Sequence, residues 1–214
     1  MRLFVCSDIH MDVTRLDRLL AQAGSPIDAV LIAGDLTNWG TAPEGEKVLA
    51  RFPKVPIAAI PGNLDTPAII ATLADHGILA HGQLVRIGEW SVVGFGGGSP
   101  QNAGEILFSD EQIIAGLEPL LKNCDPLKTI CLTHQPPFDT ALDLFGYVEH
   151  RGSHAVRDLL DRYQPAFHFC GHIHESYSEQ QLGRTLCVNV AAVKEGRAGV
   201  VDTTAGIFTR IVLS

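Results

Sequence analysis

The sequence predicts an α/β fold in which helices cover the faces of β-sheets. Five short apolar runs alternate with segments of helical periodicity, which is typical of this fold class. Because the runs are apolar throughout and do not alternate with polar residues, we expect each to be a strand buried on both faces. The runs are LFVC (3–6), AVLIA (29–33), PIAAI (56–60), TICL (129–132) and AFHFC (166–170).

Helices are predicted between several of these strands. One apolar face after the first strand is formed by Val13, Leu16, Leu20 and Ala23. N-cap residue types mark three further helix starts, namely Thr66 followed by Pro67, Ser109 in a capping box with Gln112, and Ser153. We expect Pro119 to limit or kink the helix that begins at Ser109. Regions 78–98 and 186–212 look like consecutive strands, so antiparallel pairing is also expected.

Length and composition restrict the function classes. With 214 residues, 46% hydrophobic and 19% charged, the chain is expected to form a single domain, residues 1–214. A formal charge of −8 makes nucleic acid an unlikely partner, because that binding needs a basic surface. No run reaches the ~20 apolar residues of a membrane span, and no signal peptide is evident. The five cysteines contain no C-x-x-C pair, so we expect reduced thiols in a cytoplasmic protein.

Every apolar run is followed within a few residues by Asp, Asn or His, in SDIH, GDLTN, PGNLD, THQPP and GHIHE. In open α/β sheets, ligands bind beyond the carboxyl ends of the strands. A single polar residue there is most simply a capping or turn residue, but five strand ends with ligand-type side chains indicate a metal site. The candidate ligands are Asp8, His10, Asp35, Asn63, His134, His172 and His174.

The predicted ligand set indicates two ions. Seven nitrogen and oxygen ligands exceed the number that one transition ion takes, and paired ions that share a carboxylate lie about 3.5–4 Å apart in phosphatases and nucleases. No ligand is a thiolate, so a cysteine-type structural zinc site is not expected. Imidazole with carboxylate suits Mn, Fe, Co, Ni or Zn better than Mg or Ca.

These motifs, in this order, resemble the signature of the calcineurin-like metallophosphoesterases. The resemblance spans residues 8–174 and rests on Asp8-x-His10, Gly34-Asp35, Gly62-Asn63, His134 and Gly171-His172-x-His174. It implies a four-layer α-β-β-α sandwich with two mixed central sheets. It also implies that one ion is held by Asp8, His10 and His174, that the other is held by Asn63, His134 and His172, and that Asp35 bridges them.

The chemistry expected of such a site is hydrolysis of a phosphoester by metal-activated hydroxide. The chain departs from the family at Leu64, where many members carry a histidine that helps to protonate the leaving oxygen. General-acid catalysis is typically worth about 10²–10⁴-fold, so leucine disfavours substrates with poor leaving groups. Asp65 remains as a group that orients a partner. His150 is a candidate substitute acid and His154 a weaker one, although either fits an exposed loop histidine.

The glycine-rich loop 94–104 and the remaining histidines are further candidates for a role in the site. The glycine-rich loop 94–104 lacks the G-x-G-x-x-G spacing and a P-loop lysine, so we expect a loop near the site in which Asn102 is a possible substrate contact. Its glycines fit a purely conformational role equally well. We interpret His168 as a hydrogen-bonded strand histidine and assign no role to His76 or His81.

The predicted function is therefore a binuclear metal-dependent phosphoesterase, manganese being one suitable metal, with a small phosphodiester preferred over a monoester. The alternative is a catalytically weak or silent metal-binding scaffold of the same fold, which Leu64 favours and the complete ligand set disfavours. A homo-oligomer is possible if exposed aromatic residues such as Trp39 or Phe145 line an interface.

Overall fold

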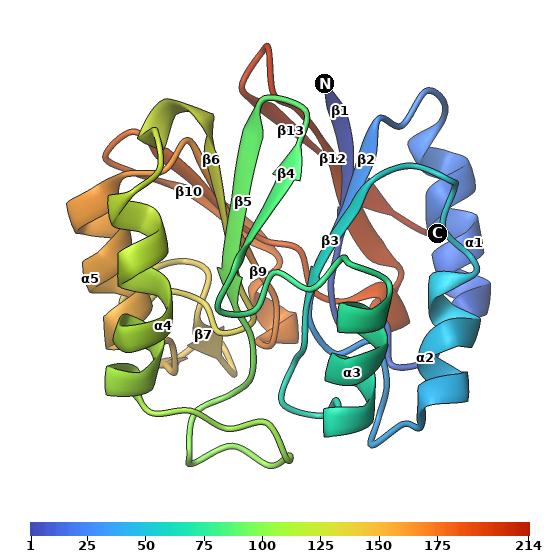
Figure 1. Cartoon of the computed structure of the whole chain (residues 1–214), viewed down its shortest axis with the longest axis horizontal. Coiled ribbons are helices and arrows are strands. Elements are labelled where there is room, and N and C mark those ends of the chain that lie inside the picture. Colours follow the sequence, from blue (N-terminus) through green and yellow to red (C-terminus); the bar gives the residue numbers. More distant parts are fainter.

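Two β-sheets pack face to face, and helices cover both outer faces, in a computed structural model that describes residues 1–214 (Figure 1). The first sheet has the strand order β13-β12-β1-β2-β3, and the second has the order β10-β11-β9-β6-β5-β4. Both sheets are mixed, because β1, β2 and β3 run parallel whereas β12 and β13 pair antiparallel. In the second sheet β5, β6, β9 and β11 are parallel, and the edge strands β4 and β10 are antiparallel.

The first sheet consists of β1 (Arg2–Cys6), β2 (Ala29–Ala33), β3 (Ile57–Ile60), β12 (Arg197–Asp202) and β13 (Ile207–Val212). The second consists of β4 (Leu84–Ile87), β5 (Trp90–Phe95), β6 (Thr129–Thr133), β9 (Phe167–Cys170), β10 (Ser178–Leu182) and β11 (Thr185–Asn189). A two-stranded hairpin is formed by β7 (Leu144–Phe145) and β8 (Glu149–His150). The helices are α1 (Val13–Ala23), α2 (Ala42–Leu49), α3 (Pro67–Asp75), α4 (Asp110–Lys122) and α5 (His154–Tyr163).

Three apolar layers hold the four structural layers together. Helices α1, α2 and α3 pack on the outer face of the first sheet, and α4 and α5 pack on the outer face of the second. Between the sheets, side chains such as Leu31, Ile60, Leu132 and Phe169 are fully buried. Each central strand therefore has an apolar environment on both sides, which explains why its sequence is continuously hydrophobic. The predicted four-layer α-β-β-α sandwich is confirmed.

Most predicted elements are present within one or two residues of their expected ends. Pro119 does not limit the length of helix α4, which continues through it to Lys122. Helix α2, strand β10 and the β7–β8 hairpin were not predicted. None of the helices combines the length and the hydrophobicity needed to cross a membrane.

Candidate metal centre

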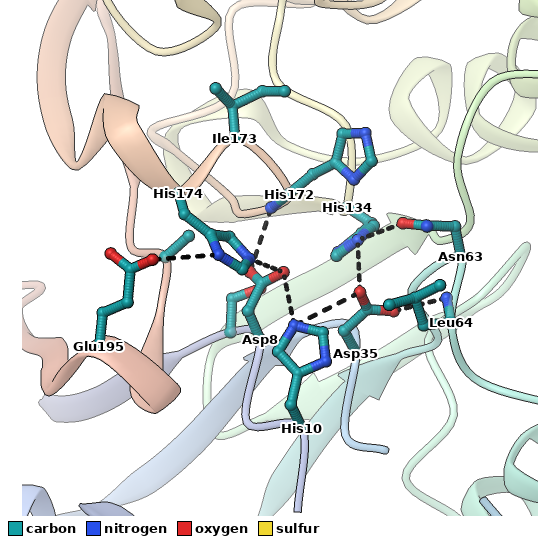
Figure 2. Close-up of polar contacts among 12 residues, drawn as sticks. Asp8, His10, Asp35, Asn63, Leu64, His134, His172, Ile173, His174 and Glu195 are labelled. Carbon is teal, nitrogen blue, oxygen red and sulfur yellow. Dashed lines mark hydrogen bonds and ion pairs between the residues drawn. The ribbon is translucent and has the colours of Figure 1, made fainter. Parts of the chain in front are cut away.

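The carboxyl ends of β1, β2, β3, β6 and β9 meet at one edge of the paired sheets, so the five loops that follow them lie side by side (Figures 1 and 2). These loops carry all seven of the predicted ligands. Six of the seven side chains turn a potential ligand atom toward the cluster, whereas the ring of His172 packs against His134 and is turned away from the carboxylates.

One group consists of Asp8, His10 and His174, whose potential ligand atoms all lie within 4.8 Å of one another. The Nε2 atoms of His174 and His10 are 3.1 Å and 3.7 Å from Asp8 Oδ1. Asp8 is fully buried between them. This arrangement of one carboxylate and two imidazoles fits a divalent transition ion.

A second group consists of Asp8, Asp35 and His134. Asp35 Oδ2 lies 3.5 Å from His134 Nε2 and 3.8 Å from His10 Nε2, so this oxygen faces both sides of the site. Asn63 joins the group through its Oδ1, which is 3.0 Å from His134 Nε2. The Nδ2 of Asn63 donates to the carbonyl of Ala103 at 2.7 Å, and this bond turns the amide oxygen toward the site.

His172 takes a different position. Its backbone N–H donates to Asp8 Oδ2 at 3.1 Å, but its ring is turned away from the two carboxylates (Figure 2). The ring lies 5.0 Å from the ring of His134 and lines a cavity beside the site. The structure therefore does not bring the imidazole of His172 into either group, and its role as a ligand stays a prediction.

Partners behind the ligands orient the imidazoles, and the sequence did not predict them. Asn38 Oδ1 is 2.6 Å from His10 Nδ1, and the carbonyl of Ala33 is 2.8 Å from His134 Nδ1. The carboxylate of Glu195 lies 3.4 Å from His174 Nδ1 (Figure 2). A carbonyl or carboxylate at Nδ1 favours the tautomer that leaves the Nε2 lone pair available to a metal ion.

Glycine allows the loops to approach closely. A Cβ at Gly62 would overlap Asp35 Oδ1, and a Cβ at Gly171 would overlap the side chains of Ser7 and Asp8. The ligand residues themselves adopt unusual backbone angles, since Asp8, His10, Asp35 and His172 all have positive φ. Such conformations are uncommon outside glycine and cluster at functional sites.

The electrostatics of the cluster are those of tightly packed opposite charges. Burial raises the pKa of Asp8, but the hydrogen bond from His174 and the nearby imidazoles outweigh burial and hold it well below its usual range. Burial lowers the pKa of His134, yet the attraction of Asp35 and Asp8 raises it to about 9. In His10 burial prevails over Asp8 and Asp35, and its pKa is lowered. Asp8 is therefore charged and available as a ligand at neutral pH.

The residues present fit a metal centre. The Nε2 of His10 is buried and has no hydrogen-bond partner, although it points between two carboxylates. An unpartnered buried nitrogen costs free energy unless something binds it. An ion seated between the two groups would satisfy this nitrogen and neutralise the buried carboxylates.

Comparison with known proteins agrees with this centre. Residues 1–176 match the family model described as calcineurin-like phosphoesterase. This chain belongs to the calcineurin-like phosphoesterases. The uncharacterized protein MJ1162 of Methanocaldococcus jannaschii is 31% identical to it over 170 residues, which are 76% of each chain.

Solved structures show the same fold at low sequence identity. The crystal structure of TT1561 of Thermus thermophilus superposes with a TM-score of 0.78 at 19% identity and covers 99% of this chain and 98% of its own. The phosphopantetheinyl hydrolase of Mycobacterium tuberculosis superposes with a TM-score of 0.61 at 16% identity, covering 89% of this chain and 88% of its own.

Asp65 of this phosphoesterase lies behind the metal centre. It is fully buried, and its carboxylate accepts four hydrogen bonds, from the N–H groups of Leu36, Thr37 and Gly62 and from the Thr37 hydroxyl. These bonds tie the loop that carries Asp35 to the loop that carries Asn63. This geometry is that of a positioning residue, and a catalytic role for Asp65 stays a prediction.

His150 lies on the hairpin β7–β8 at the rim of the site. Its Nδ1 is 2.7 Å from Oδ1 of the fully buried Asp143, and its Nε2 is 3.6 Å from Asp139 Oδ1. The hydrogen bond to Asp143 raises the pKa of His150, because the carboxylate stabilises the protonated ring. Asp143 was missed by sequence reasoning, because nothing local marks it as a partner of His150.

Two adjoining cavities lie on this side of the protein, and the small one reaches the candidate metal centre. The small cavity, of about 450 Å³, is lined by His172, His174 and Glu195 among others. The large cavity, of about 740 Å³, is lined by His150 and His154 with neighbouring loop residues. Asn102 and Arg151 line both, so the two cavities meet there.

The glycine-rich loop contributes to this arrangement. The N–H of Glu105 donates to the carbonyl of Asn63, while Asn63 Nδ2 donates to Ala103, so the loop holds Asn63 from both sides. A Cβ at Gly104 would overlap the carbonyl of Asn63, which explains a glycine at that position. The loop therefore positions Asn63 and also presents Asn102 to both cavities.

Proposed function

We propose that this chain is a cytoplasmic, binuclear metal-dependent phosphoesterase that hydrolyses a small phosphodiester within one domain, residues 1–214. The observation that carries the proposal is the buried, unpartnered Nε2 of His10 between Asp8 and Asp35. Asp35 Oδ2 lies within 3.8 Å of one imidazole from each proposed ligand set, which supports a bridging role for this carboxylate. All five cysteines are free, which supports a reducing compartment.

The ligands are assigned as the family resemblance implies. Asp8, His10 and His174 would hold one ion, Asn63, His134 and His172 would hold the other, and Asp35 would be shared. The nitrogen and oxygen donors suit manganese, iron, nickel, cobalt or zinc. Divalent ions bound there would lower the pKa of a water molecule and draw charge from the phosphoryl oxygens.

We favour a diester over a monoester as the substrate for two reasons. Leu64 replaces the histidine that serves as the acid in many family members, and the large cavity has room for an alcohol group. Leu64 cannot donate a proton. The large cavity joins the small cavity, which is lined by His172 and His174. The large cavity can receive the leaving alcohol.

His150 is the proposed acid for that alcohol. Water would release one proton to solvent as its oxygen bonds to phosphorus and the ester P–O bond breaks. The proton on Nε2 of the protonated His150 would pass to the departing oxygen and leave a neutral ring. Asp143 supports this role, because its buried carboxylate holds Nδ1 and raises the pKa of the ring. Imidazole acids act best when their pKa lies near the working pH.

A second candidate function is a metal-binding scaffold with little or no turnover. The observation that favours it is the apolar, half-buried Leu64 at the edge of the site. A scaffold has no need for oriented imidazoles, so the bonds behind His10 and His134 favour the enzyme.

Turnover separates the two candidates. Protein stripped with chelator and reloaded with manganese should release 4-nitrophenolate from bis(4-nitrophenyl) phosphate faster than from 4-nitrophenyl phosphate. Asp35→Asn keeps an oxygen for the N–H of Leu64, now 2.8 Å from Asp35 Oδ1, but removes the charge. It should lose tight binding of the metal pair and the turnover while remaining folded by circular dichroism. Two bound ions in the wild type without turnover of either ester would favour the scaffold.

A further inference from the structure

The charges that line the large cavity favour an uncharged occupant rich in hydrogen-bond donors. Arg151 is already paired with Glu149 at 2.7 Å, and His150 is paired with Asp143 at 2.7 Å. Asp110 and Glu111, at the start of α4, form no ion pair. Asp110 accepts one bond, from the hydroxyl of Ser153 at 2.6 Å. The free carboxylate oxygens repel a second phosphate and accept bonds from hydroxyl groups.

A largely buried glutamine, whose side-chain amide has no protein partner, also lines this cavity. Gln135 directly follows the metal-ligand candidate His134, and it is only 4% exposed. Its backbone carbonyl accepts a bond from Thr133, but its side-chain amide forms no hydrogen bond within the protein. A side-chain amide offers a donor and an acceptor side by side, the pattern that reads the edge of a nucleobase.

Aromatic rings complete the lining. The rings of Phe138 and His154 are stacked at 3.9 Å with an angle of 30° between their planes, and both line the large cavity. His154 is exposed at the first position of α5, so its ring is accessible to a ligand. Base stacking on aromatic side chains is sequence-tolerant and contributes strongly to binding of nucleotides.

From these three features we infer that the large cavity binds a nucleoside as one half of the diester. The ribose hydroxyls are placed to bond to Asp110 and Glu111, as acidic residues bind ribose in dinucleotide sites. The base stacks on His154 over Phe138, and its edge meets the amide of Gln135. This inference rests on the proposed function, because the phosphate is taken to lie at the adjoining small cavity.

Three esters that release the same product test the inference. Uridine 5′-(methyl phosphate) offers ring and hydroxyls, glyceryl methyl phosphate offers hydroxyls alone, and benzyl methyl phosphate offers a ring alone, and loss of the alcohol in the large cavity gives methyl phosphate from each. For the manganese-loaded wild type, kcat/KM for the uridine ester should exceed that for each of the others by at least ~10-fold, the scale of one stacked base. Equal values for the three esters would overturn the inference while leaving the proposed function intact.

Variants locate the preference within the cavity. His154→Ala and Gln135→Leu should each lower the ratio of uridine-ester to benzyl-ester kcat/KM by ~10-fold, through KM rather than kcat. His76→Ala removes an exposed histidine at the end of α3, paired with Glu46, and should leave the ratio unchanged. A ratio that is the same in His154→Ala and Gln135→Leu as in the wild type contradicts the inference.

A binding measurement works without turnover. Uridine titrated into the wild type should shift the side-chain amide NMR signal of Gln135, and the shift should be absent with glycerol. If no ester is hydrolysed but uridine shifts this signal, the proposed function fails and the nucleoside site stands. If uridine leaves the signal unmoved, the nucleoside site is refuted whatever the turnover.

Discussion

The backbone and the side chain of Leu64 have different roles at the site. Its N–H donates to Asp35 Oδ1 at 2.8 Å, and its carbonyl accepts from the N–H of Trp39 at 2.7 Å. These bonds hold the proposed bridging carboxylate and do not depend on the side chain. The side chain lies beside Asp35 at the edge of the site (Figure 2). A substitution at this position can therefore change the chemistry without moving the ligands.

Leu64→His tests whether a proton donor is missing there. We expect the rate with poorly departing alkyl diesters to rise at least ~10-fold, because general-acid catalysis is worth about 10²–10⁴-fold. The rate with 4-nitrophenyl diesters, whose leaving group needs no proton, should change little. The measurement is kcat for a series of diesters of increasing leaving-group pKa. A uniform change across the series would show that histidine acts by some other route.

Asn38 is the second residue whose role can be isolated. The bond between its Oδ1 and His10 Nδ1 fixes the ring that carries the unpartnered Nε2. Asn38→Ala should weaken manganese binding by about 10–100-fold, the usual effect of removing such a supporting bond. Calorimetric titration of chelator-stripped protein measures it. Asn123→Ala, which removes an exposed side-chain bond at the end of α4, should leave the affinity unchanged.

The ligand candidates could be predicted from the sequence, whereas their supporting partners could not. Each candidate follows a buried strand, so a local pattern and one rule about strand ends are sufficient to find it. Glu195 reaches His174 only because the segment after β11 returns to the end of β1, where the N–H of Val193 donates to Ser7. Such contacts between distant segments leave no local signal. The turned ring of His172 is a further detail of this kind.

At the scale of elements, the hairpin β7–β8 is organised by one buried carboxylate. Asp143 accepts five hydrogen bonds, from the N–H groups of Asp139, Thr140 and Gly152, the Thr140 hydroxyl and the ring of His150. Each strand has only two residues, too few for a stable ladder of its own. The hairpin therefore depends on Asp143 for its conformation.

Asp143→Asn should change the hairpin in a pH-dependent way. The pKa of His150 is raised in the folded protein, so its pairing with Asp143 stabilises the fold fully below the ordinary histidine pKa of 6.5. This stabilisation is lost as the pH rises through the raised pKa. The variant should bring the pKa of His150 down toward 6.5 and cost about 1–3 kcal/mol of unfolding free energy. NMR titration of the His150 ring and urea unfolding measure the two effects.

Asp75→Asn, at the end of α3 and far from the hairpin in sequence, is the matched control and should leave the His150 titration unchanged. If the titration of His150 is the same in wild type and Asp143→Asn, the carboxylate does not hold the ring. In that event the proposed proton donor loses its structural support.

The elements that the sequence failed to predict share a physical reason. Helix α2, with sequence APEGEKVL, contains proline and glycine and buries only Gly45, Val48 and Leu49. Its apolar pattern is therefore too short to reveal a period. The Thr41–Glu44 capping box was the one readable sign. Strands with a continuous apolar run were predictable, whereas helix α2, strand β10 and the hairpin depend on contacts that form only in the folded chain.

At the scale of the whole molecule, His168 couples stability to pH. It is fully buried in β9, and burial lowers its pKa to about 3. Its Nε2 lies 2.8 Å from the Thr133 hydroxyl, which donates to Gln135, so the ring donates and its Nδ1 has no partner. The predicted strand histidine is therefore hydrogen-bonded at one nitrogen only. The folded chain keeps this ring neutral.

His168→Gln should make the protein less sensitive to acid. Below pH 6.5 His168 binds a proton in the unfolded chain, whereas in the folded chain it stays neutral down to about pH 3. The free energy of unfolding therefore falls as the pH is lowered across this window. The loss approaches about 1.4 kcal/mol per pH unit, or roughly 2 kcal/mol between pH 6.5 and pH 5. Urea unfolding at pH 7 and pH 5, with chelator present, should show a smaller difference in the variant by that amount.

Thr133→Val distinguishes titration from simple loss of the hydrogen bond. It removes the partner of His168 Nε2 but keeps the ring that titrates. The unfolding free energy should therefore fall at both pH values while its pH dependence stays close to that of the wild type. If His168→Gln and the wild type lose equal stability between pH 7 and pH 5, the buried ring does not stay neutral in the folded protein. The acid sensitivity of the sandwich would then have to come from other buried groups, such as His81 and His172, because burial lowers the pKa of each to about 4.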